Sequence, residues 1–80
     1  MKIKFTLSER ELLRDLTMDD SGISDKLFAM PDGQKEYVIE CDVDDLEFFN
    51  GYVAADSNHC EDKALKSKFD RLFWKIDKQL

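Results

Sequence analysis

Two short segments of the chain alternate strictly between the two sides of an extended backbone. They cover residues 2–7 and 35–41. The residues on the apolar sides are Ile3, Phe5 and Leu7 in the first segment and Tyr37, Ile39 and Cys41 in the second. An alternation of period two is typical of a strand with one buried face, so the pattern predicts two β-strands. The chain between them is long enough for a right-handed crossover, which leaves a parallel pairing open.

A short helix is expected directly after the first strand. Ser8 and Glu11 have the spacing of a capping box, in which each side chain accepts a hydrogen bond from the other residue's backbone N–H. We expect this helix to end near Thr17, with an apolar side formed by Leu12, Leu13 and Leu16. If Ser8 is the N-cap, its replacement by alanine should destabilise the protein by about 1 kcal/mol.

A second short helix is expected from about Ile23 to Met30, with Leu27 between them on the same buried side. The turn before this helix ends at Gly22, and glycine adopts a positive φ without a steric penalty. The Pro-Asp-Gly sequence at 31–33 stops the helix and suits a type I turn.

Two longer helices are expected after the second strand. Asp42 is the expected N-cap of the third helix, which runs to about Asn58, and the final helix extends from about Glu61 to the C-terminus. Their core-facing residues recur at the helical period and are Leu46, Phe49, Val53 and Cys60, followed by Leu65, Phe69, Leu72, Phe73, Ile76 and Leu80. We therefore predict a single α+β domain over residues 1–80. It has a two-stranded sheet, two short helices between the strands, and two longer helices packed as a hairpin on the sheet.

The third helix has a second apolar stripe, and the last helix carries a tryptophan away from its core face. The stripe consists of Phe48, Tyr52, Ala55 and His59, and the tryptophan is Trp74. A helix with two apolar faces is either sandwiched within its own domain or uses one face for a partner. We interpret these residues as a partner surface, because exposed aromatic patches usually signal association. The alternative is that Phe48 and Tyr52 are buried under the second short helix.

Self-association is one expected use of this surface. Two strands leave two open sheet edges, and pairing two copies would cover exposed apolar residues in one isologous contact. We therefore expect a homodimer at micromolar or higher concentration, weakened by Phe48→Asp or Trp74→Asp. The expected function is a protein-interaction or regulatory module without catalytic activity.

A row of basic residues offers a second interpretation of the last helix. Lys68, Arg71, Lys75 and Lys78 form a stripe beside Trp74. Lysines that contact phosphates and an indole that stacks on a base are typical of nucleic-acid binding. The net charge of −6 opposes this interpretation, because it repels nucleic acid at long range. A third interpretation is an acidic DNA mimic that occupies a nucleic-acid-binding protein.

The composition favours a small cytoplasmic protein. Of the 80 residues, 42% are hydrophobic, which is enough for a packed core and too much for a disordered chain. Neither a signal peptide nor a transmembrane segment is expected. Cys41 and Cys60 are too few for a disulfide framework, so we expect free thiols in a reducing compartment, with a single bridge between them left open.

No catalytic or metal-binding constellation stands out. The acidic segment 42–47 lacks the glycine and the glutamate that an EF-hand loop requires at fixed positions. Cys41, His59 and Cys60 lack the paired spacing of a structural zinc site. With three glycines in the chain, neither a phosphate-binding loop nor an oxyanion-hole turn is expected. We therefore expect no enzyme activity, no metal and no cofactor.

Two segments of the C-terminal half, G-Y-V-A-A-D-S-N-H at 51–59 and E-D-K-A-L-K-S-K-F-D-R-L-F at 61–73, carry a family resemblance. They are similar to small uncharacterised bacterial proteins that end in a comparable helix pair. This resemblance implies a bacterial protein and brings no known activity. It marks Tyr52, Asn58 and His59 as the residues to test first.

Overall fold

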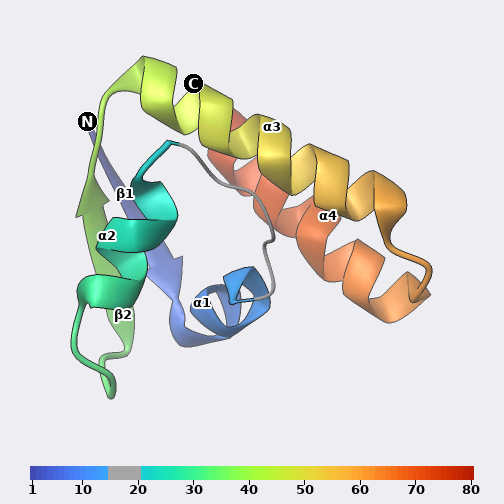
Figure 1. The fold of residues 1–80 in the computed structure, drawn as a ribbon, viewed down its shortest axis with the longest axis horizontal. Coiled ribbons are helices and arrows are strands. Elements are labelled where there is room, and N and C mark those ends of the chain that lie inside the picture. Colours follow the sequence, from blue (N-terminus) through green and yellow to red (C-terminus); the bar gives the residue numbers. More distant parts are fainter. Residues whose placement is uncertain (15–20) are drawn as a thin grey trace.

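The computed structural model describes residues 1–14 and 21–80. In chain order, the elements are β1 (Lys2–Thr6), α1 (Leu7–Leu13), α2 (Ile23–Ala29), β2 (Glu36–Glu40), α3 (Val43–His59) and α4 (Lys63–Asp77). The sheet lies at one side with α2 across it, while α3 and α4 run side by side (Figure 1). The expected α+β fold, with two short helices between the strands and a C-terminal helix hairpin, is confirmed.

The two strands pair antiparallel, so the parallel pairing that the sequence left open is wrong. Ile3 lies opposite Ile39, and Phe5 lies opposite Tyr37. Between the strands, α1 and α2 have seven residues each and return the chain to the end of β1, where β2 begins. Both orientations bury the same alternate residues, so the alternation alone did not distinguish them.

The first helix begins earlier than expected. Thr6 is its N-cap: the Thr6 hydroxyl accepts a hydrogen bond from the Glu9 N–H at 3.1 Å, and the Glu9 carboxylate accepts one from the Thr6 N–H at 2.7 Å. The assignment of Ser8 and Glu11 as the capping box is therefore wrong. Both pairs have the same spacing, but an ion pair from Lys75 to Glu9 at 2.6 Å supports the earlier one.

Both glycines that flank α2 adopt a positive φ. Gly22 has the expected positive φ of 83°, and Gly33 has a φ of 91°. Met30 follows the helix and is only partly buried. The expected end of the first helix at Thr17, together with Leu16 on its apolar side, lies outside the described residues.

The two long helices begin with different caps. Asp42 occupies the N-cap position of α3 as expected, but its side chain makes no capping hydrogen bond. Asp62 caps α4, and its carboxylate accepts hydrogen bonds from two backbone N–H groups of the first turn. For this reason α4 begins at Lys63 rather than near Glu61.

The core lies between the sheet and the helices, and every element contributes to it. Its buried apolar residues are Ile3, Phe5, Leu13, Ile23, Leu27, Tyr37, Ile39, Cys41, Leu46, Phe49, Val53, Phe69, Leu72 and Ile76. Leu80 was expected in the core and is exposed, because α4 ends at Asp77. Leu7 was expected on the buried side of the first strand and is also exposed, because the strand ends at Thr6.

A buried arginine joins α1, α2 and β2. Arg10 is 3% exposed, and its guanidinium donates hydrogen bonds to the carbonyls of Leu27 at 3.4 Å and Met30 at 3.0 Å. It also donates to the carboxylate of Asp32 and to the hydroxyl of Tyr37. The two carbonyls lie at the C-terminal end of α2, so Arg10 supplies donors that this helix end lacks.

The local pattern gives only a weak sign that Arg10 is buried. A charged residue on a short helix is normally exposed, but Arg10 precedes Leu13 by about one helical turn and shares its face. Its guanidinium also lies 4.6 Å from the ring centroid of Tyr37 and 5.5 Å from that of Phe28. A guanidinium that is paired, hydrogen-bonded and stacked on aromatic rings can be buried.

Thr6→Ala should destabilise the protein by about 1 kcal/mol, because it removes the side-chain cap of α1. Ser8→Ala leaves that cap intact and should change the free energy of unfolding by less than about 0.5 kcal/mol. Denaturant titration followed by circular dichroism measures both values. A larger loss from Ser8→Ala than from Thr6→Ala would place the cap at Ser8 and contradict the observed start of α1.

The bond between Arg10 and Asp32 should make stability depend on pH. The Arg10 hydrogen bond, together with its positive charge, lowers the pKa of Asp32 from its ordinary value of 3.8. The stability gained is present above that value and is lost as the pH falls below it. The wild type should therefore be more stable than Asp32→Asn at about pH 6, with the difference shrinking towards about pH 2. Thermal unfolding across this range tests the prediction, and a constant difference would contradict it.

Candidate protein-interaction surfaces

The outer side of α3 carries an exposed phenylalanine. We call this surface the α3 face, and it is lined by Asp44, Glu47, Phe48, Gly51, Tyr52 and Ala55. Phe48 is 56% exposed, and its ring meets that of the partly buried Tyr52 edge to face, with 5.3 Å between centroids. The other side of the helix supplies Leu46, Phe49 and Val53 to the core. Phe48 therefore lies outside the core, and the alternative that it is buried under the second short helix is wrong.

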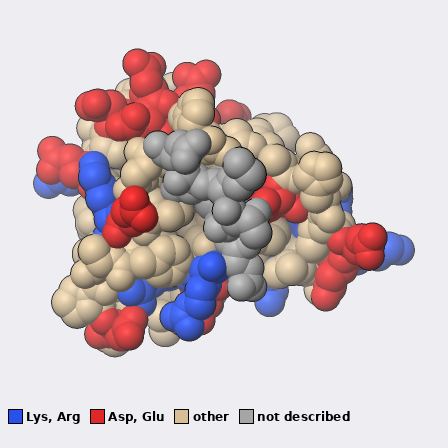
Figure 2. Space-filling view, in the orientation of Figure 1, with Lys and Arg blue, Asp and Glu red and all other residues tan. Residues whose placement is uncertain are grey.

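The α3 face is acidic. Asp44 and Glu47 line it together with Phe48, and none of its lining residues is Lys or Arg. Figure 2 shows acidic side chains gathered over the beginning of α3, where Asp44 and Asp45 occupy the first turn. A partner group with positive charge is therefore favoured at this face.

A second hollow adjoins the α3 face at Glu47 and Gly51. It lies between α3 and the end of α4 and is lined by Val43, Glu47, Asn50, Gly51, Phe73, Asp77 and Leu80. Asn50 is 4% exposed, and its Nδ2 donates to the Phe73 carbonyl at 3.4 Å, which fixes the orientation of the amide. Within the described residues, Asn50 Oδ1 has no hydrogen-bond partner. This buried acceptor therefore keeps unused hydrogen-bonding capacity.

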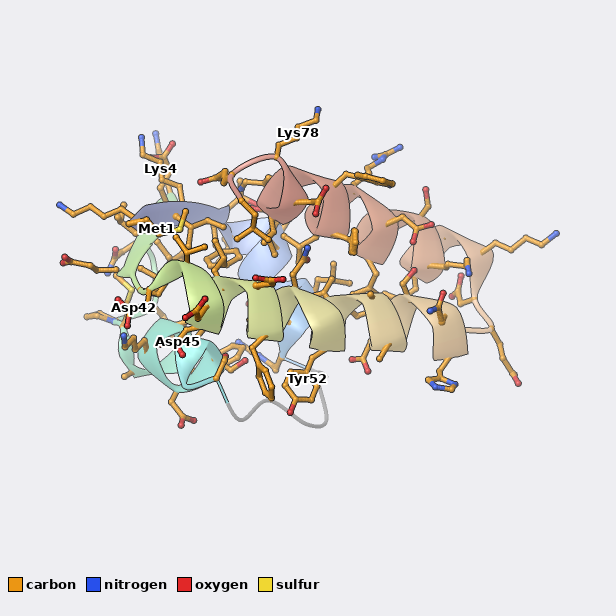
Figure 3. All side chains as sticks on the ribbon, turned by 90° about the horizontal axis from the view of Figure 1, so that it is seen from above. Met1, Lys4, Asp42, Asp45, Tyr52 and Lys78 are labelled. Carbon is orange, nitrogen blue, oxygen red and sulfur yellow. The ribbon has the colours of Figure 1, made fainter. Side chains whose placement is uncertain are left out.

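Trp74 lies on a different side of the helix pair from the α3 face. It is 59% exposed, and its ring meets that of Phe73 edge to face at 5.3 Å. Lys78 follows Trp74 by about one turn and shares its side of α4. Figure 3 shows Lys78 and Tyr52 projecting to opposite sides of the molecule. The structure therefore does not bring Trp74 and Phe48 into one surface.

The remaining member of the predicted stripe on α3 is His59. It is exposed in the last turn of the helix, about one turn beyond the exposed Ala55. Burial raises the pKa of the neighbouring Asp56, and the charge of His59 acts in the opposite direction. His59 lies outside the set of residues that line the α3 face.

The basic stripe on α4 is only partly available to a partner. The Lys75 ammonium donates to the Lys4 carbonyl at 2.7 Å and to the Glu9 carboxylate at 2.6 Å, so Lys75 ties α4 to β1 and α1. Its interpretation as a free nucleic-acid contact is not supported by this geometry. The exposed members of the stripe are Lys68, Arg71 and Lys78.

A groove that the sequence did not indicate runs between α1 and α4. We call it the α1–α4 groove; it has a volume of about 700 Å³ and is lined by Leu7, Ser8, Glu9, Glu11, Leu12, Leu65, Lys68, Phe69, Arg71 and Leu72. Leu7 is 45% exposed, whereas the alternating pattern had placed it inside. The sequence feature that could have indicated this groove is the presence of two leucines, Leu7 and Leu12, on one short helix. A helix of this length has few neighbouring residues to cover both side chains.

The two cysteines lie beyond opposite ends of α3. This helix has 17 residues and is therefore about 25 Å long, whereas a disulfide needs Cα atoms within about 7 Å. A bridge between Cys41 and Cys60 is therefore excluded, and both are free thiols. Burial raises the pKa of the Cys41 thiol, which lowers its reactivity. Among the described residues, no group of three or more His, Cys, Asp or Glu is placed to hold a metal ion.

No family model, curated protein or solved structure matches the chain. The resemblance to small bacterial proteins therefore stays a prediction. Across residues 1–14 and 21–80, no helix is both long and apolar enough to cross a membrane. A proposal for the function rests on the chemistry of the surfaces described above.

Proposed function

We propose that the chain is a small protein-interaction module that binds a basic and apolar segment of another protein on its α3 face. The observation that carries this proposal is the exposure of Phe48, on a helix whose opposite side already completes the core. Docking would remove this ring from water, and aromatic anchors of this kind supply much of the binding energy at interfaces.

The charge around Phe48 supports a basic partner rather than a second copy at this face. The α3 face and the hollow beside it contain the carboxylates of Asp44, Glu47 and Asp77, with no Lys or Arg among their lining residues. Pairing two α3 faces would bring like charges together, whereas a basic segment would meet opposite charges.

Nucleic-acid binding on α4 is the second candidate. The observation that favours it is the exposed Trp74 with Arg71 and Lys78 exposed on the same helix. An indole can stack on a base while these cations contact phosphates. Only three basic residues of the predicted stripe remain exposed, and the chain has a net charge of −6, so this candidate is the weaker one.

Affinity capture with matched variants tests the α3 face. Wild type, Phe48→Asp and Trp74→Asp would each be immobilised and exposed to lysate of the organism that encodes the chain, once untreated and once treated with nuclease. We expect at least one basic protein to be retained by wild type and Trp74→Asp. Phe48→Asp should retain it at least about tenfold less well, because loss of an aromatic anchor costs about 2 kcal/mol or more.

Both substitutions are at exposed positions, so circular dichroism should show intact folds. The same proteins retained by all three baits would contradict the proposal. Binding lost only with Trp74→Asp, or only after nuclease treatment, would move the function to the α4 side and its nucleic-acid alternative.

A further inference from the structure

The α1–α4 groove exposes apolar residues along the edge of the core. Phe69 and Leu72 form its buried base, Leu12 and Leu65 are only partly buried, and Leu7 stands exposed at its edge. The groove shares no lining residue with the α3 face. It is therefore a separate surface, and its use does not depend on what the α3 face binds.

The two sides of the groove carry opposite charges. On the α1 side, Glu9 is held by Lys75, while Glu11 is exposed. Glu11 pairs with Arg14 of its own helix at 3.2 Å, but both side chains are more than half exposed, so this pair is weak and exchangeable. On the α4 side, Lys68 and Arg71 are both exposed.

We propose that a second copy of this chain occupies the α1–α4 groove and forms a two-fold symmetric dimer. In an isologous contact the same patch must be complementary to itself. A two-fold axis that runs along the groove places the acidic α1 side of each copy against the basic α4 side of the other. It also turns the exposed Leu7 of each copy towards the apolar floor of its partner. The charged residues that line the α3 face are all acidic, so this face lacks the self-complementarity of the groove.

The size of the patch sets the expected strength. Ten residues line the groove, whereas a standard stable interface uses about 20–30 residues on each side. The dimer is therefore weak, with dissociation in the micromolar range. The α3 face shares no lining residue with the groove, so the α3 faces of both copies stay available in the dimer.

Charge reversal on the two sides of the groove tests the proposal by sedimentation equilibrium. Glu11→Lys should weaken the dimer at least about tenfold, since like charges then face each other across the axis. The double variant K68E/R71E should do the same. Mixing these two variants should restore a dimer, because each reversed side then meets a side of opposite charge. Matched controls are Glu61→Lys for Glu11→Lys and the double variant K63E/K78E for K68E/R71E, which make the same charge changes at exposed positions outside the groove.

The result expected is a wild-type dimer, two weakened variants, a restored mixture and unaffected controls. A wild type that stays monomeric up to about millimolar concentration would overturn the proposal, as would a mixture that stays monomeric. A dimer that is weakened by Phe48→Asp but not by the groove variants would place self-association on the α3 face instead. Because the groove variants leave Phe48 in place, failure of this proposal is distinguishable from failure of the proposed partner binding.

Discussion

The buried guanidinium of Arg10 is the interaction on which the arrangement of the N-terminal half depends. It extends from α1 and donates hydrogen bonds to the carbonyls at the end of α2. It also donates to Asp32 in the following loop and to Tyr37 in β2. Helices of seven residues are not stable alone, so α1 and α2 depend on their buried apolar residues and on tertiary contacts of this kind. The position of α1 in turn determines which of its apolar residues lie next to α4, and these residues line one side of the α1–α4 groove.

A closed core leaves several large apolar side chains outside it, and their surroundings differ. Phe48 lies beside the carboxylates of Asp44 and Glu47, Trp74 lies on the side of α4 that also carries Lys78, and Leu7 lies at a groove with one acidic and one basic side. These differences favour different partners: a basic segment for the α3 face and a second copy for the groove.

The sequence predicted what depends on local spacing and missed what depends on contacts between distant residues. Strand alternation and helical periodicity identified the elements and most of the core, because both follow from backbone geometry. Strand orientation was not predictable, since either orientation buries Phe5 and Tyr37. The exposure of Phe48 was expected, but its separation from Trp74 depends on how α3 and α4 pack. The roles of Arg10 and Lys75 depend on partners at least 17 residues away.

The central claim is that the core is complete without the exposed apolar residues of the proposed interaction surfaces. Two adjacent phenylalanines on α3 test it most directly, since Phe49 is buried in the core and Phe48 is more than half exposed. Phe49→Ala should lower the free energy of unfolding by about 3–5 kcal/mol, the usual cost of a buried aromatic ring. Phe48→Ala should lower it by less than about 1 kcal/mol, as expected at an exposed site. Denaturant unfolding of the two variants measures the difference, and equal losses would contradict the account.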